Sequence, residues 1–162
     1  MGYFAPLIAS LFLVGFLAIF AQESRVASIS STAIAAQSTG QSFLAYRNAV
    51  MTYQQNNPTF LGTIPAATIA AIGGPFSASF LTQVSNVVVS TGIRNGRVVI
   101  CYGPFTQSVA AEAAQAANND ASFGVSNGAT WTSAAIGAPT TAMPLVTTIT
   151  AGNVLSVIQM DL

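Results

Sequence analysis

The fold of this chain is decided by NVVVSTGIRNGRVVICY, residues 86–102. Two runs rich in β-branched residues, 86–90 and 97–102, favour strands and lie on either side of Asn95-Gly96. This dipeptide is preferred in a type I′ turn, because both central residues of that turn take positive φ. Gly103-Pro104 follows directly and is expected to end the second strand. The stretch therefore predicts an antiparallel β-hairpin.

Downstream of this hairpin, the chain carries three further element signals. Residues 107–118 are mostly strong helix formers, and Asn119-Asp120 is expected to stop that helix. Residues 123–131 alternate large and small side chains around Asn127-Gly128, which is a second hairpin candidate. Residues 154–160 predict a terminal strand.

Upstream, apolar residues recur at steps of three and four between residues 27 and 55, which predicts a long helix. Gly40 is a candidate interruption, and the helix is expected to end before Pro58. Residues 65–72 predict a short helix, while Phe80-Leu81 is expected to form a short strand or the entry to a turn. The fold class is therefore α+β: one long helix, a small antiparallel sheet and one or two packing helices.

The N-terminal stretch, residues 3–21, contains no charged residue. At the helical rise of 1.5 Å per residue it reaches about 28 Å, close to the hydrocarbon thickness of a bilayer. A secretory signal peptide cleaved before Gln22 is one interpretation of this stretch. The absence of any basic residue before Arg25 and the length of the apolar run favour an uncleaved single-pass anchor.

This interpretation divides the chain into three parts: an anchor over 1–22, a juxtamembrane long helix over 23–57 and an α+β domain over 58–162. Within the anchor, Ser10 and Gly15 are small positions that could admit a neighbouring helix, although they lack the four-residue spacing of a dimer motif.

The composition is poor in charge, with four basic and four acidic residues among 162 and no lysine. Globular domains normally carry about a quarter of their residues as charges. This surface is typical of exported proteins and of subunits packed in an assembly, so we expect the domain to lie outside the cytoplasm. Nucleic acid is not an expected partner, because binding phosphates requires clustered Lys and Arg.

The side chains needed for catalysis are scarce. The chain has no His, which removes the usual general base, the commonest metal ligand and every Ser-His triad. The single Cys101 can form neither an internal disulfide nor a structural zinc site. A packed core thiol is the simpler interpretation of Cys101, and an intermolecular bridge or reactive thiol is the alternative. We expect no enzyme activity and no catalytic, cofactor-binding or metal-binding residues.

Two residues beyond the anchor are candidate partner contacts. Arg47 lies on the long helix among Phe43, Tyr46 and Val50, where its stem could equally cover the core. Trp131 is the single tryptophan and is either a core or an interface residue. Residues 132–141 are small, polar and interrupted by proline, so we expect a surface loop of the kind that often serves in docking.

Several short motifs follow the N-terminal anchor in a fixed order: Tyr46-Arg47-Asn48-Ala49-Val50 followed by Tyr53, Asn57-Pro58, Gly62-Thr63, Gly96-Arg97-Val98-Val99, and Gly152-Asn153-Val154 within residues 144–158. This order resembles the PilM family, the small proteins of plasmid- and island-encoded type IVb thin pili. The resemblance implies an inner-membrane protein with a periplasmic domain that serves in pilin transport or in the pilus basal body. It offers no catalytic residues. The resemblance implies other pilus-assembly proteins or pilins as partners. Residues 3–21 predict contact with membrane lipid, and the small positions Ser10 and Gly15 allow a homo-oligomer.

A pilin-like subunit that polymerises through its N-terminal helix is the alternative. Type IV pilins carry a basic leader and a glutamate at the fifth position of the mature chain. This sequence has no basic leader, and the fifth residue is Leu7 counted from Tyr3, or Ala5 counted from Met1. The missing carboxylate favours a machine component over a pilin.

Overall fold

The computed structural model describes residues 31–92 and 96–160. Contacts divide the chain into two compact units, Met1–Ala35 and Ala36–Leu162. The sheet, both core clusters and the candidate site all belong to the second unit. Within the described ranges, no helix is both long and apolar enough to cross a bilayer. The anchor predicted over residues 3–21 lies outside these ranges and stays a prediction.

A helix runs over residues 31–56, as the three- and four-residue periodicity predicts. Ala36, Phe43, Tyr46 and Val50 are buried, so the apolar stripe faces the core. The helix ends next to Pro58, and the Asn57 N–H donates to the Tyr53 carbonyl at 2.9 Å.

Gly40 does not interrupt this helix, so that expectation is wrong. Its function is close packing. A Cβ at Gly40 would lie 2.8 Å from Glu112 Cβ and 3.0 Å from the Ala113 nitrogen. The glycine therefore lets another helix approach the backbone directly.

The remaining elements form three short helices and one sheet. The helices are α2 (Ala66–Gly73), α3 (Ala78–Leu81) and α4 (Gln107–Ala116). The strands are β1 (Ser85–Ser90), β2 (Arg97–Gly103), β3 (Phe123–Ser126), β4 (Gly128–Ser133), β5 (Met143–Ile149) and β6 (Val154–Met160). The sheet is antiparallel with the order β1-β2-β6-β3-β4-β5, which confirms the α+β class.

Both predicted hairpins are present. β1 pairs with β2 from Ser85↔Tyr102 to Ser90↔Arg97, and the Thr91 N–H closes the loop onto the Gly96 carbonyl at 3.0 Å. The type of the turn stays a prediction, because Asn95 lies outside the described residues. β3 and β4 form the second hairpin, in which Gly128 takes a φ of 97°.

The structure corrects two expectations about local elements. Phe80-Leu81 is not a strand: it lies in α3, where the Ser77 side chain caps the helix by accepting from the Phe80 N–H at 3.2 Å. Residues 143–149 form strand β5, which the sequence did not predict. β5 lies at the edge of the sheet. Proline has no backbone N–H, but Pro144 is tolerated there because no further described strand pairs with the outer side of β5.

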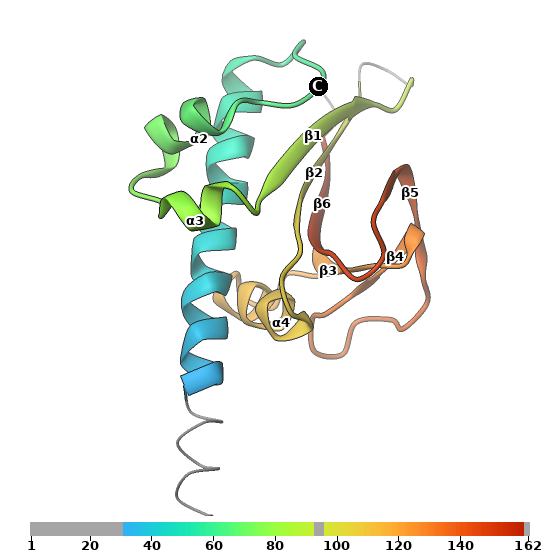
Figure 1. The fold of residues 1–162 in the computed structure, drawn as a ribbon. Coiled ribbons are helices and arrows are strands. Elements are labelled where there is room, and N and C mark those ends of the chain that lie inside the picture. Colours follow the sequence, from blue (N-terminus) through green and yellow to red (C-terminus); the bar gives the residue numbers. More distant parts are fainter. Residues whose placement is uncertain (1–30, 93–95, 161–162) are drawn as a thin grey trace, which may run out of the picture. The chain divides into compact units, whose positions relative to one another are not determined.

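Figure 1 shows the sheet strands with the long helix and α4 beside them. The core of the described residues consists of two clusters, which lie on opposite faces of the sheet because successive residues of β2 belong to different clusters. On one face, Val99 and Cys101 pack against Phe43 and Tyr46 of the long helix and against α4. On the other face, side chains of β2 and β6 pack with residues of β4 and β5: Val98, Ile100, Leu155, Trp131 and Ile149. Because both faces are covered, the central strands have continuous apolar runs.

Cys101 is fully buried in the first cluster, which confirms the core-thiol interpretation. Burial raises the pKa of this thiol to about 12. A thiol with such a pKa is almost wholly protonated at neutral pH and is a poor nucleophile.

A buried amide connects the long helix, the segment before α2 and the sheet. The Asn86 side chain accepts from the Ile64 N–H at 2.8 Å and donates to the Ile64 carbonyl at 2.9 Å. It also donates to the Tyr46 hydroxyl at 2.7 Å. Burial raises the pKa of Tyr46 to about 12, although the hydrogen bond with Asn86 opposes this rise.

Candidate functional site

The candidate site begins where strand β3 leaves the sheet. β2 pairs with the whole of β6, from Val154 to Met160, whereas β3 pairs only with the first three residues of β6. The last bond on this side runs from the Val157 N–H to the Ser122 carbonyl, at 2.9 Å. Beyond that bond, β2 is the only described strand next to β6.

The hydrogen-bond ladder between β3 and β6 stops because the Asp120 side chain accepts the next backbone N–H, that of Ser122. The Ser122 N–H donates to Asp120 Oδ1 at 2.8 Å, so it is turned away from β6. Just upstream, Asn118 and Asn119 take φ angles of 57° and 61°, which turn the chain out of α4. Asparagine is among the few residues that tolerate this left-handed conformation.

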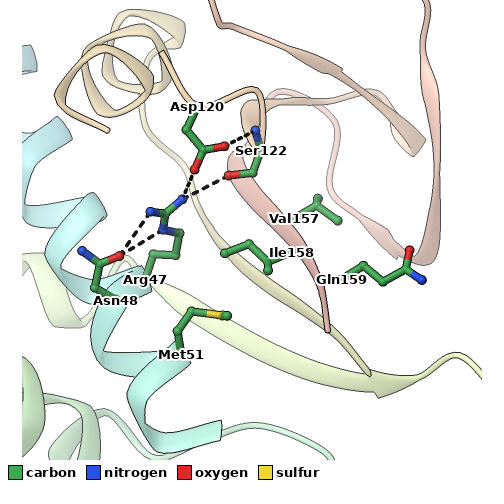
Figure 2. A pocket seen from close by; sticks show the side chains of 8 residues that line it. All are labelled: Arg47, Asn48, Met51, Asp120, Ser122, Val157, Ile158 and Gln159. Carbon is green, nitrogen blue, oxygen red and sulfur yellow. Dashed lines mark hydrogen bonds and ion pairs between the residues drawn. The ribbon is translucent and has the colours of Figure 1, made fainter. Parts of the chain in front are cut away.

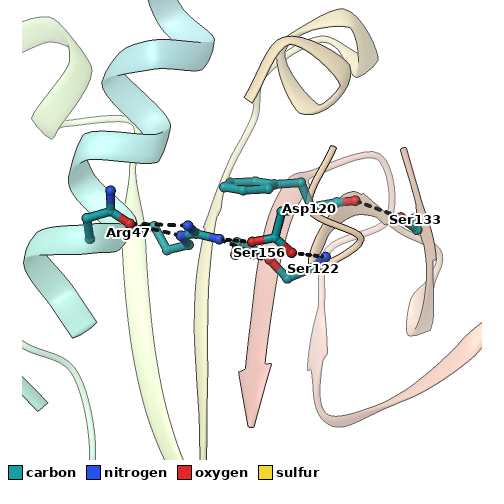
Figure 3. Close-up of polar contacts among 7 residues, drawn as sticks. Arg47, Asp120, Ser122, Ser133 and Ser156 are labelled. Atoms are coloured by element: carbon teal, nitrogen blue, oxygen red, sulfur yellow. Dashed lines mark hydrogen bonds and ion pairs between the residues drawn. The ribbon is translucent and has the colours of Figure 1, made fainter. Parts of the chain in front are cut away.

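Arg47 of the long helix holds this turn in place (Figure 3). Its Nη1 donates to Asp120 Oδ2 at 2.5 Å and to Ser122 Oγ at 3.1 Å. Its Nε and Nη2 donate to Asn48 Oδ1 at 3.3 and 3.2 Å. The guanidinium also lies over the ring of Phe123, with 4.5 Å from Cζ to the ring centroid. The head group of Arg47 is thus engaged in contacts within the chain, and its side chain is only 12% exposed.

Asp120 is held in its charged form. Burial alone would raise the pKa of this carboxyl, but the hydrogen bonds from the Ser122 backbone and from Arg47 outweigh it and lower the pKa below its ordinary value of 3.8. Both carboxylate oxygens already accept hydrogen bonds. Asp120 therefore acts as an anchor for Arg47 and Ser122, and it is poorly suited to take a proton from a substrate at neutral pH.

A groove of about 480 Å³ lies beside these residues (Figure 2). We call it the β6 groove. Its lining combines the Arg47–Asp120 ion pair with amide, hydroxyl and apolar side chains: Arg47, Asn48, Met51, Asp120, Ser122, Val157, Ile158 and Gln159. The charges in this lining balance each other, so the groove offers hydrogen bonds and apolar contact without net charge.

The other residues predicted as sites fall elsewhere. Ser10 and Gly15 lie outside the described residues. Trp131 is 5% exposed and packs in the second core cluster. In the predicted docking loop, Thr132 and Ser133 belong to β4, while the segment that follows is irregular and contains Ile136, which is 72% exposed.

Asp120, Ser122 and the open side of β6 are parts of the site that the sequence does not predict. The one available signal is Asn118-Asn119-Asp120 after a helix. This run predicts only the end of the helix, because nothing local indicates that Arg47 lies beside it.

The comparisons with known proteins address the family. The model of the PilM family matches residues 9–157. The fold is similar to the crystal structure of a protein described as PilM from Escherichia coli B7A, with a TM-score of 0.51 and 14% sequence identity over 76% of this chain and 90% of that chain. No curated protein matches the sequence. Since the family model covers nearly the whole sequence, the chain belongs to the PilM family, which indicates a pilus-related role.

Proposed function

We propose that this chain is a non-enzymatic component of a type IVb pilus biogenesis apparatus, in its basal body or in pilin transport. Residues 3–21 anchor it in the inner membrane, and the unit Ala36–Leu162 lies in the periplasm. The observation that carries this proposal is the family match over residues 9–157, which includes most of the apolar stretch as well as the folded unit. The low charge of the chain supports a position outside the cytoplasm.

The geometry of the candidate site supports a binding role over a catalytic one. Arg47 and Asp120, the charged residues of the groove, use their polar atoms on each other and on Ser122 and Asn48. A general base works best when its pKa lies near the working pH. The pKa of Asp120 is lowered instead, and each of its oxygens already accepts a hydrogen bond.

Location is tested on the full chain in its native cell envelope. We expect an unprocessed N-terminus by mass spectrometry, and recovery in the inner-membrane fraction. A protease added to spheroplasts should degrade the domain, while a cytoplasmic marker stays intact. A mature chain that begins at Gln22 and is free in the periplasm would refute the anchor, and protection from the protease would refute the orientation.

The role in pilus assembly is tested by deletion and complementation. We expect the deletion strain to lose surface pili and the full chain to restore them. The pilin-like alternative predicts a different result in the same cells, because a structural subunit should appear in sheared pili in amounts comparable to the main pilin. A machine component should stay with the inner membrane. Normal piliation of the deletion strain would refute both roles.

A further inference from the structure

The backbone of β6 offers unused hydrogen-bonding groups to the β6 groove. The Val157 N–H points towards β3, because it donates to the Ser122 carbonyl. Backbone groups of a strand repeat their direction every second residue, so the N–H and C=O of Gln159 point to the same side. On the opposite side, Gln159 stands across from Val98 of β2.

The Val157 carbonyl also faces this side, and its natural donor is lost. In a continued ladder the Ser122 N–H would supply that bond, but it donates to Asp120 instead. Three backbone groups, the Val157 C=O and the Gln159 N–H and C=O, thus have no backbone partner among the residues that the structure describes. Such an edge is a template for an added strand.

We infer that the β6 groove receives one extended segment of a partner protein, which continues the sheet beyond Ser122 where β3 leaves it. The inference rests on the proposed function, because it takes the partner from the same pilus system. It adds to that function the place of docking and the conformation of the docked segment.

The walls of the groove favour a single segment over the sheet edge of a second folded domain. Arg47, Asn48 and Met51 of the long helix line one side, and Asp120 and Ser122 line another. Figure 2 shows Met51 extending from the helix towards Ile158 of β6. A volume of about 480 Å³ lies within the range of ligand pockets, roughly 300–1,000 Å³, and would hold only a short peptide segment.

The residues that line the groove also determine which side chains the docked segment can carry. Ile158 pairs with Val99, which belongs to the core cluster on the helix side, so the Ile158 side chain faces that side too. A residue of the docked segment that lies beside Ile158 would point towards Met51, where an apolar side chain fits. Because the charges of Arg47 and Asp120 neutralise each other, the docked segment should be uncharged at the positions that enter the groove.

The test uses the purified full chain and two sets of synthetic 12-residue peptides. One set covers the sequences of the other proteins of the same pilus system, and the other covers residues 1–30 of this chain. The readout is hydrogen exchange at the Gln159 amide. We expect at least one uncharged peptide to slow this exchange tenfold or more. If no peptide does so, the inference is wrong. If only a peptide from residues 1–30 of this chain slows the exchange, the docked segment comes from this chain and the partner assignment is wrong.

Two substitutions at one position separate strand pairing from side-chain contact. Gln159→Ala keeps the N–H and removes only side-chain contact, so it should weaken binding of the peptide much less than Gln159→Pro does. Gln159→Pro removes the N–H that faces the groove and should weaken binding at least tenfold, with only a small change in melting temperature. Ile158→Pro is the matched control, because the N–H of Ile158 faces β2 and its loss should unfold the strand. Equal binding by Gln159→Ala and Gln159→Pro would overturn the inference.

If Gln159→Pro does not fold, Met51→Trp tests from the opposite wall whether the peptide occupies the groove. The larger side chain fills the groove and removes no bond of the sheet, so it should block the peptide at least tenfold. Unchanged binding by Met51→Trp would also overturn the inference. The proposed function fails separately, if deletion of the gene leaves piliation normal, whatever the peptides do at Gln159.

Discussion

At the scale of single residues, Arg47 connects parts of the chain that are far apart in sequence. It joins the long helix to Asp120 and Ser122 through its Nη1, and it covers the ring of Phe123. The Arg47 side chain is 12% exposed, so solvent screens it less than it screens a fully exposed ion pair, whose median value is about 0–1 kcal/mol. The Asp120 side chain is 34% exposed, so solvent still screens the pair.

We predict a measurable interaction between these two side chains in a double-mutant cycle. Arg47→Met keeps the apolar stem, and Asp120→Asn keeps the shape of the carboxylate. The coupling free energy from urea unfolding should be about 1 kcal/mol, within the range of about 0.5–3 kcal/mol for side chains in contact. A matched cycle between Arg47→Met and the exposed Thr52→Ala should give no coupling. Additive effects of Arg47→Met and Asp120→Asn would contradict the prediction.

The pH dependence of the free energy of unfolding should reflect the charge of Asp120. The pKa of Asp120 is lower in the folded state than its ordinary 3.8. Its contribution to the free energy of unfolding is therefore fully present above about pH 4, and it is lost as the pH falls through the lower, folded-state pKa. The difference between the wild type and Asp120→Asn should be constant near neutral pH and shrink below pH 4. A difference that grows on acidification would show that the sign is wrong.

The buried amide of Asn86 offers a third prediction at this scale. Asn86→Leu has a similar volume but leaves the Ile64 N–H, the Ile64 carbonyl and the Tyr46 hydroxyl without their partner. Each buried polar group without a partner costs about 1–3 kcal/mol. We expect a loss of roughly 3 kcal/mol or more in urea unfolding. The exposed Gln83→Ala serves as the control and should change stability little. A loss below 1 kcal/mol in Asn86→Leu would contradict this account.

At the scale of elements, the contact between the long helix and α4 depends on Gly40. In an exposed helix, Gly→Ala stabilises by about 1 kcal/mol. At Gly40 the new methyl would lie 3.0 Å from the Ala113 backbone nitrogen, which cannot move without α4. We therefore expect Gly40→Ala to destabilise by about 1–3 kcal/mol in thermal unfolding. Gln41→Ala, on the exposed face, is the control and should be nearly neutral. Stabilisation by Gly40→Ala would refute the close approach.

The elements predicted correctly are those whose signal is local. The β1–β2 strands follow from β-branched runs, α4 from a run of strong helix formers, and the long helix from its apolar stripe. α3 was missed because a four-residue helix has too few residues to show a period, and the Ser77 cap decides it. β5 was missed because its side chains are mostly exposed and Pro144 argues against a strand unless its place at the edge is known.

The candidate site was predictable only in part. The place of Arg47 among Phe43, Tyr46 and Val50 makes it a candidate contact, but its partner Asp120 is 73 residues away in sequence and no local pattern indicates it. The open side of β6 depends on where β3 ends, and this is decided by the side chain of Asp120 instead of by any strand propensity. Sequence patterns indicate which residues form strands, but they do not give the length over which two strands pair.

At the scale of the whole molecule, we predict that a fragment of residues 31–162 folds without the N-terminal stretch, because both core clusters lie within Ala36–Leu162. It should melt in a single cooperative transition and protect the amides of β2 and β6 from exchange. A fragment of residues 49–162 lacks Phe43 and Tyr46, and deleting such core side chains costs about 3–5 kcal/mol each. That loss is comparable to the whole stability of a domain, about 5–15 kcal/mol, so the shorter fragment should not fold. A folded 49–162 fragment would mean that the long helix is dispensable for the sheet, whereas an unfolded 31–162 fragment would mean that residues 1–30 contribute to the fold.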